Sequence, residues 1–179
     1  MVTPTLVAAI INQHKLRTSR SIHFVDHWAR VLENGRKLVP LTGARLDVVE
    51  FFAVFHDSGR QSDGFDHQHG LRGAEIARRM RGTYYDLDPD GFDLLILACS
   101  GHNHGDTLAD VTVQTCWDSD RLDLGRAGYI PSPHKLCTAA ARTDEMIAWA
   151  HERSIHRIIP DLVQAEWGLT VDSAGNFSK

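Results

Sequence analysis

The stretch 48–55 constrains the fold more than any other part of the sequence, because its residues are apolar almost all the way round a helix. A helix of this kind lies at the centre of a protein rather than on its surface. His56 and Asp57 follow it directly. A buried carboxylate is costly unless it is paired, hydrogen-bonded or bound to a metal, although an aspartate that only caps the helix end is the simpler interpretation. The sequence predicts a helical protein with a polar group at the end of its central helix.

Length and composition limit the class of protein. The chain has 179 residues, a formal net charge of −4 and 42% hydrophobic residues. This length allows one sizeable core but hardly two, and the ordinary hydrophobic content argues against disorder. A slightly acidic chain lacks the basic excess that binds a long nucleic acid. We therefore expect one domain over residues 1–179 and no long nucleic-acid partner.

Cysteine usage and apolar runs bear on the cellular compartment. The three cysteines form no C-x-x-C pair, so neither a disulfide framework nor a thiolate zinc site is indicated. The longest apolar runs, 6–11 and 94–99, have six residues each, far fewer than a membrane span needs. No signal peptide is recognised at the N-terminus. We expect a cytoplasmic protein without a membrane partner.

Helical periodicity runs through nearly the whole sequence, and capping residues mark several starts. Thr3 and Pro4 begin the first helix, and Asp88 and Pro89 begin the fifth. The predicted helices cover residues 4–15, 21–34, 44–56, 69–81, 89–100, 111–124, 135–152 and 160–167. Gly35 is expected to stop the second helix, and a short strand is the alternative for 111–116. Residues 171–179 are expected to be loose.

The chain has eleven histidines, and seven of them lie between residues 23 and 104. His23, His27, Arg30 and Asn34 share one side of the second predicted helix. That side is ordinarily a solvated polar face. Histidines at positions i and i+4 beside an arginine also suit a metal ion or a phosphate.

Three further segments carry histidine or aspartate beside predicted helices. They are the loop 63–70, the stretch 100–106 and the segment 117–123, whose aspartates are ordinarily part of a solvated, salt-bridged face. Each segment alone is weak evidence. Together they offer imidazole nitrogens and carboxylate oxygens without thiolates, a donor set that favours Mn, Fe, Mg, Ni or Co over structural zinc.

The order of these residues resembles that of the HD superfamily of metal-dependent phosphohydrolases, and most closely an uncharacterised bacterial subgroup. The matching elements are His27 followed by Arg30 and Val31, the His56-Asp57 doublet, and the late aspartate Asp120 before Arg121 and Leu122. The resemblance covers a motif region at 20–126, with C-terminal helices over 131–168. It implies an all-α, single-domain helical bundle of the HD type.

The resemblance also implies a set of ligands for one or two divalent metal ions, with Asp57 between the two ions. The set comprises His27, His56, Asp57, His69, His102 and Asp120. Two replacements stay open, because His23 could take the place of His27 and His104 that of His102.

The activity implied by the resemblance is hydrolysis of a nucleotide or another small phosphate ester through metal-activated water. Asp57, Arg60 and His104 are the expected catalytic residues. Arg60 is the first choice to clamp the phosphate, before Arg30 and Arg121. His104 or His23 would carry a proton to the leaving group. Lys135 could reach an anionic substrate.

Two other functions stay open. The same ligands could hold iron in a mixed-valence di-iron oxygenase on the same fold, a branch that the resemblance includes. A non-catalytic, metal-containing ligand-binding module is the third reading. The sequence also leaves a homodimer open.

Overall fold

The computed structural model describes residues 1–16, 21–172 and 176–178, and helices dominate them. The α-helices are α1 (Pro4–Gln13), α2 (Val25–Thr42), α3 (Leu46–Phe55), α4 (His69–Met80), α5 (Pro89–Gly101), α6 (Val111–Arg121), α7 (Asp144–Ile155) and α8 (Leu162–Ala165). Two short 3-10 helices, η1 (Leu124–Ala127) and η2 (Pro133–Lys135), follow α6. A two-stranded antiparallel sheet joins β1 (Thr170–Val171) to β2 (Phe177–Ser178). The predicted all-α class is confirmed.

The helix starts agree with the local capping signals. The Thr3 hydroxyl accepts a hydrogen bond from the amide of Leu6 at 3.2 Å, and the Asp88 carboxylate accepts one from the amide of Gly91 at 3.0 Å. α6 starts in the same way, because Asp110 accepts from the amide of Thr112 at 2.7 Å. Each cap satisfies an amide that the first helical turn leaves without a partner. The strand alternative for 111–116 is therefore wrong.

The prediction that Gly35 stops the second helix is wrong. α2 begins at Val25, four residues later than expected, and runs through Gly35 to Thr42. A Cβ on Gly35 would overlap the Cγ1 atom of Val49, so the glycine serves the close crossing of α2 and α3. The helix ends at Gly43, whose φ of 75° is a left-handed conformation that glycine adopts without strain.

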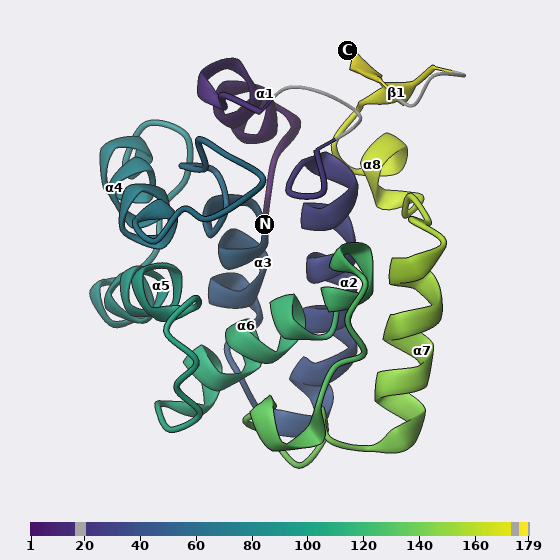
Figure 1. The fold of residues 1–179 in the computed structure, drawn as a ribbon. Helices are drawn as coiled ribbons and strands as arrows, with labels where there is room; N and C mark the ends of the chain where they lie inside the picture. The colour runs from purple at the N-terminus through teal and green to yellow at the C-terminus, as the bar shows by residue number, and fades with distance from the viewer. Residues whose placement is uncertain (17–20, 173–175, 179) are drawn as a thin grey trace.

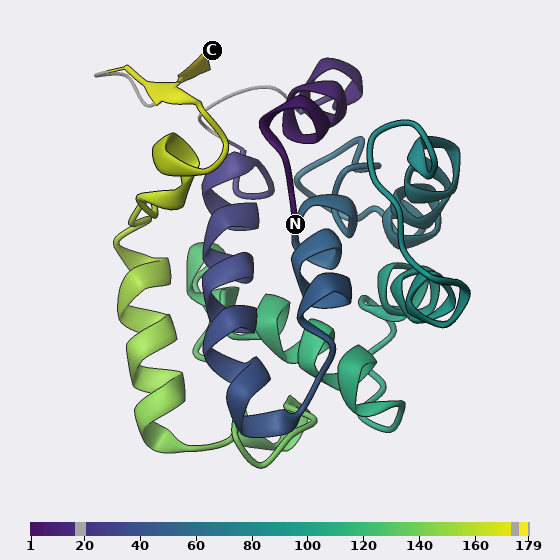
Figure 2. The same cartoon turned by 180° about the vertical axis from the view of Figure 1, so that it is seen from behind.

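The central place predicted for the apolar stretch is correct. Every residue of α3 from Val48 to Phe55 is buried. Figures 1 and 2 show α3 between α4 and α5 on one side and α2 and α7 on the other, with α6 crossing one face of the bundle. This packing brings the C-terminal end of α3 to the middle of the molecule.

The C-terminal part departs from the prediction in two places. The helix expected over 135–152 begins only at Asp144, because residues 136–143 form turns after η2. The tail expected to be loose instead pairs β1 with β2, and the ring of Phe177 lies 5.8 Å from that of Phe24. Residues 173–175 and 179 of that tail lie outside the described residues.

Within the residues that the structure describes, none of the helices combines the length and the apolar character that a membrane crossing requires.

Candidate metal centre

The structure brings all six predicted ligands together from five segments of the chain. His27 lies in the first turns of α2, and His56 and Asp57 follow the last turn of α3. His69 is the first residue of α4, His102 directly follows α5, and Asp120 lies in the last turn of α6. All of them are buried except Asp120, whose side chain is 13% exposed. Such buried histidines and aspartates could hold a metal ion.

One oxygen of Asp57 faces a first donor group, which we define as His27, His56 and Asp120. Asp57 Oδ2 lies 3.5 Å from His27 Nε2 and 3.7 Å from His56 Nε2. Asp120 Oδ1 lies 3.4 Å from His27 Nε2 and 3.8 Å from His56 Nε2. The two Nε2 atoms themselves are 3.0 Å apart.

The other oxygen of Asp57 faces a second donor group, which we define as His69 and His102. Asp57 Oδ1 lies 3.3 Å from His69 Nε2 and 3.6 Å from His102 Nε2, and these two nitrogens are 2.8 Å apart. A single carboxylate therefore stands between two sets of converging imidazoles.

Each of the four histidine rings in the two donor groups has an oxygen acceptor beside Nδ1, the ring nitrogen that points away from Asp57. His27 Nδ1 lies 2.8 Å from Asp123 Oδ2, and His102 Nδ1 lies 2.7 Å from the carbonyl oxygen of Cys99. His56 Nδ1 faces two carbonyl oxygens of α3, and His69 Nδ1 faces the carbonyl oxygen of Asp66. These partners only accept hydrogen bonds, so each neutral ring carries its proton on Nδ1 and turns the lone pair of Nε2 inward.

Converging lone pairs repel one another unless a cation lies between them. Donor atoms about 2.1 Å from one ion are about 3.0 Å apart in adjacent octahedral positions and about 3.4 Å apart in a tetrahedron. Within the two donor groups and Asp57, the separations run from 2.8 to 3.8 Å. Both the distances and the fixed tautomers fit a metal ion, since ligating histidines commonly donate their other N–H to an oxygen.

Two glycines let α4 approach the centre closely enough to present His69. A Cβ on Gly70 would lie 2.5 Å from the carbonyl oxygen of Cys99 and 3.1 Å from His102 Nδ1. A Cβ on Gly73 would overlap the carbonyl oxygens of Phe55 and His56. A larger side chain at either position would push α4 away from the second donor group.

Burial and charge set the protonation of the centre. Burial lowers the pKa of His56 to about 3 and that of His69 to about 4, so both rings are neutral near pH 7. Burial opposes the charge of Asp57, yet His56 and His23 beside it hold the pKa of that carboxyl well below its usual range. Burial likewise opposes the charge of Asp120, whose pKa Arg126 and His56 lower. Neutral imidazoles and ionised carboxylates are the forms that bind metal.

Two contacts around the ligands were not assigned from the sequence. Asp123 holds His27 and in turn accepts hydrogen bonds from Arg30, at 2.7 Å from its Nε. His23 Nδ1 donates to Asp57 Oδ2 at 2.7 Å, so His23 touches the carboxylate between the donor groups. His23, His27 and Asp57 also form a cluster that could hold an ion, so the replacement of His27 by His23 stays open.

The solvated face considered for 117–123 is not what the structure shows. Asp118 and Asp123 are fully buried. Asp118 accepts hydrogen bonds from the amides of Cys137 and Thr138, at 2.6 and 2.8 Å. It thereby joins the segment after η2 to α6, whereas Asp120 belongs to a cluster that could hold an ion and Asp123 binds His27.

The arginines considered for phosphate binding differ in which of their guanidinium nitrogens are already hydrogen-bonded within the protein. Arg30 is buried against Asp26 and Asp123, and Arg121 donates to the carbonyl oxygens of Lys135 and Asp106. Arg60 Nε donates to Asp57 Oδ1 at 3.1 Å, and its Nη1 donates to two loop carbonyls. No described residue pairs with its Nη2. Arg60 is the one of the three that could also meet a ligand.

His104 stands apart from the other predicted site residues. It is exposed in the loop after α5 and does not belong to the described clusters that could hold an ion. His23 lies at the cavity beside the centre, and its Nε2 has no described partner. The structure therefore places His23, rather than His104, next to the groups that Asp57 joins.

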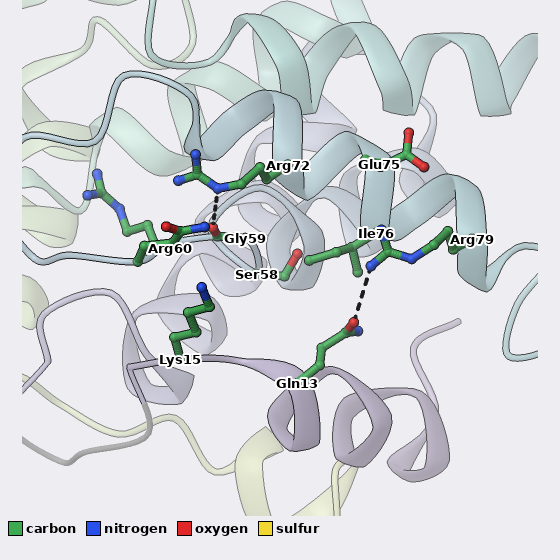
Figure 3. A pocket seen from close by; sticks show the side chains of 10 residues that line it. Gln13, Lys15, Ser58, Gly59, Arg60, Arg72, Glu75, Ile76 and Arg79 are labelled. Carbon is green, nitrogen blue, oxygen red and sulfur yellow. Dashed lines mark hydrogen bonds between the residues drawn. The ribbon is translucent and has the colours of Figure 1, made fainter.

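Two cavities meet at Arg60. A cavity of about 350 Å³ opens over the metal centre, and Asp57, Arg60, Arg126 and Lys135 are among its lining residues. A smaller cavity of about 190 Å³ lies between α1, the turn after α3, and α4. Figure 3 shows this smaller cavity, with the ammonium group of Lys15 directed toward Gly59 and the Arg60 guanidinium directed away from Lys15. None of the clusters that could hold an ion lines it.

Comparisons with protein-family models, with curated proteins and with solved structures found no match to this chain.

Proposed function

We propose that the chain is a metal-dependent phosphohydrolase of the HD superfamily that cleaves a nucleotide or another small phosphate ester. The observation that carries the proposal is the position of Asp57, whose two oxygens face two sets of inward-turned histidine nitrogens. Two donor groups joined by one carboxylate have the donor types and spacing of a two-ion centre for Mn, Fe, Mg, Ni or Co. The proposed location is the cytoplasm, where free cysteines such as the three buried ones persist.

When bound, the ions would lower the pKa of a water molecule and neutralise charge on phosphoryl oxygens. In the overall reaction a water oxygen bonds to phosphorus, the bond from phosphorus to the ester oxygen breaks, and a proton reaches that oxygen. The products are an alcohol and inorganic phosphate.

The side chains around the centre have separate tasks in this proposal. Arg60 Nη2 binds a phosphoryl oxygen while Nε keeps its hydrogen bond to Asp57. His23 donates from Nδ1 to Asp57, so its Nε2 carries a lone pair and can accept and pass on a proton. Burial lowers the pKa of His23, which favours the neutral ring that this role requires.

The test begins with elemental analysis of protein purified without chelator, followed by phosphate release from a panel of nucleotides and small esters under anaerobic conditions. We expect metal in the protein and phosphate release that chelator abolishes. Asp57→Ala should lose both metal and activity while its circular dichroism stays helical. His67→Ala is the matched control, because His67 is exposed and lies outside the clusters that could hold an ion.

The same experiment separates the alternatives. Full metal content and unchanged activity in Asp57→Ala would contradict the proposal. Iron together with oxygen consumption, and no phosphate release, would favour the di-iron oxygenase. Metal without turnover of any substrate on the panel would favour a ligand-binding module.

A further inference from the structure

The cavity over the metal centre continues into a second cavity of about 310 Å³. The two share Arg121, Leu124 and Lys135 as lining residues, so they adjoin along the side of α6 and η1. A substrate held at the metal centre can therefore extend into the second cavity.

The lining of the second cavity is mostly apolar. Tyr129, Ile130, Pro131 and Leu136 contribute to it. Tyr129 is 66% exposed and Ile130 is 71% exposed, and they are neighbours in the chain. Adjacent large apolar side chains that remain exposed at the mouth of a pocket are typical of a surface that contacts a ligand.

The chain holds this apolar surface in a defined place beside the centre. Gly128 has a φ of 83° and ends η1, and the amide of Tyr129 donates to the carbonyl oxygen of Leu124 at 3.2 Å. Arg121, the neighbour of Asp120, donates to the carbonyl oxygen of Lys135 at 2.9 Å. Residues 128–135 are thus held against the last turn of α6, which carries the candidate ligand Asp120.

The charges of the second cavity are few. Arg121 uses both of its terminal nitrogens on carbonyl oxygens, so it offers little to an anion. Lys135 is exposed and has no described carboxylate partner. Among the described residues of the junction, Lys135 is the one cation without a bound partner, which suits a single phosphoryl group at the centre. A second phosphate farther along would meet an apolar wall.

We propose that the second cavity receives the leaving group of the phosphate ester, and that this group is aromatic or otherwise apolar. Lys135 binds a phosphoryl oxygen at the junction of the cavities, and Tyr129 and Ile130 contact the leaving group. The inference rests on the proposed function, since it assigns the substrate class of that same site.

The test uses two phosphonates that cannot be hydrolysed, methylphosphonate and phenylphosphonate, bound to the Mn²⁺-loaded protein and measured by calorimetry. They share the anionic group and differ in the apolar part. We expect phenylphosphonate to bind about tenfold more tightly. Tyr129→Ala should reduce this preference to about threefold. Tyr84→Ala should leave it unchanged, because Tyr84 is 40% exposed and does not line the cavity.

Lys135→Met separates the anionic contact from the apolar one. It should weaken the binding of both phosphonates about tenfold and leave their ratio intact, because only a charge-assisted contact to the shared group is lost. His134→Ala, in the same short helix but outside both linings, is its control.

Equal affinity for the two phosphonates would overturn the inference, as would a preference that Tyr129→Ala leaves intact. Hydrolysis of phosphate esters without any such preference would refute the leaving-group cavity and retain the phosphohydrolase. A preference for phenylphosphonate in a protein that hydrolyses no ester would refute the proposed function and retain the cavity as a binding site.

Discussion

The two donor groups that share Asp57 are held in different ways. In the first donor group, His27 is fixed by the charged side chain of Asp123, which Arg30 holds at 2.7 Å. In the second, His69 and His102 are fixed by main-chain carbonyl oxygens and by the close approach of α4 that Gly70 permits. His56 of the first donor group is also fixed by main-chain carbonyl oxygens, so the buried charge on Asp123 is what distinguishes the first group from the second. Substitutions should therefore damage them by different physical routes.

The largest effect is expected from Asp123→Asn. The amide would lack the charge that orients His27, and losing the partner that orients a ligating histidine typically costs about 10- to 100-fold in metal affinity. Arg30 would also lose a buried partner, so we expect the free energy of unfolding to fall by about 3 kcal/mol. Metal titration and urea unfolding measure the two effects.

Asp118→Asn is the matched comparison, five residues earlier in the chain and on α6. Asp118 is equally buried but binds the amides of Cys137 and Thr138 rather than a candidate ligand. We expect a loss of stability of about 2 kcal/mol with metal affinity unchanged. Similar metal affinities in the Asp118 and Asp123 variants would contradict the role assigned to Asp123.

A smaller and more selective effect is expected from Gly70→Ala. The new Cβ would lie 2.5 Å from the carbonyl oxygen of Cys99, so α4 would shift and separate His69 from His102. We expect affinity at the second donor group to fall about tenfold while the first keeps its ion. Gly64→Ala is the control, because its Cβ would meet only the hydroxyl of Ser62 at 3.5 Å. Equal loss of both ions in Gly70→Ala would show that the groups are not independent.

The smallest effect concerns pH and involves one histidine from each group. In the metal-free protein the pKa values of His56 and His69 are about 3 and about 4, below the ordinary value of 6.5. Between pH 7 and 6 the unfolded chain therefore takes up protons that the folded protein does not, and stability falls as the pH falls. Burial lowers the pKa of His102, but the nearby carboxylates of Asp57 and Asp120 outweigh it and raise the pKa, so His102 opposes the trend.

We expect a net loss of about 1 kcal/mol between pH 7 and 6, measured by urea unfolding in chelator. His56→Gln and His69→Gln should each reduce the slope, which compares the two donor groups directly. A slope that neither substitution changes would place the titrating groups elsewhere in the protein.

Local signals predicted the first and fifth helix starts and the central helix well, because the information lies within a few residues. Thr3 and Asp88 cap their own helices, and the stretch 48–55 is apolar apart from Glu50. Gly35 misled the prediction because its reason is a contact with Val49 on another helix. The helix expected from residue 135 starts later, since Asp118 binds the amides of Cys137 and Thr138.

The candidate ligands could be predicted as a set because their order along the chain resembles that of the HD superfamily, and the resemblance implies the set. Their supports could not, since Asp123 and His27 are separated by 96 positions and nothing local joins them. The available signal was the run of three aspartates at 118, 120 and 123, on α6 and just after it. Asp118 binds main-chain amides, Asp120 lies among the candidate ligands and Asp123 binds His27, and only the fold distinguishes these roles.

Under the proposed function, the assembly of the centre from distant segments makes the stability of the protein depend on metal supply. His27 and Asp120 lie at opposite ends of the region that supplies the ligands, so an unfolded chain cannot present the complete set. An ion that binds only the folded protein adds about 4 kcal/mol of stability when its free concentration is about a thousand times the Kd. Under the proposed function, a cell short of the metal would lose the protein to unfolding and proteolysis as well as the activity.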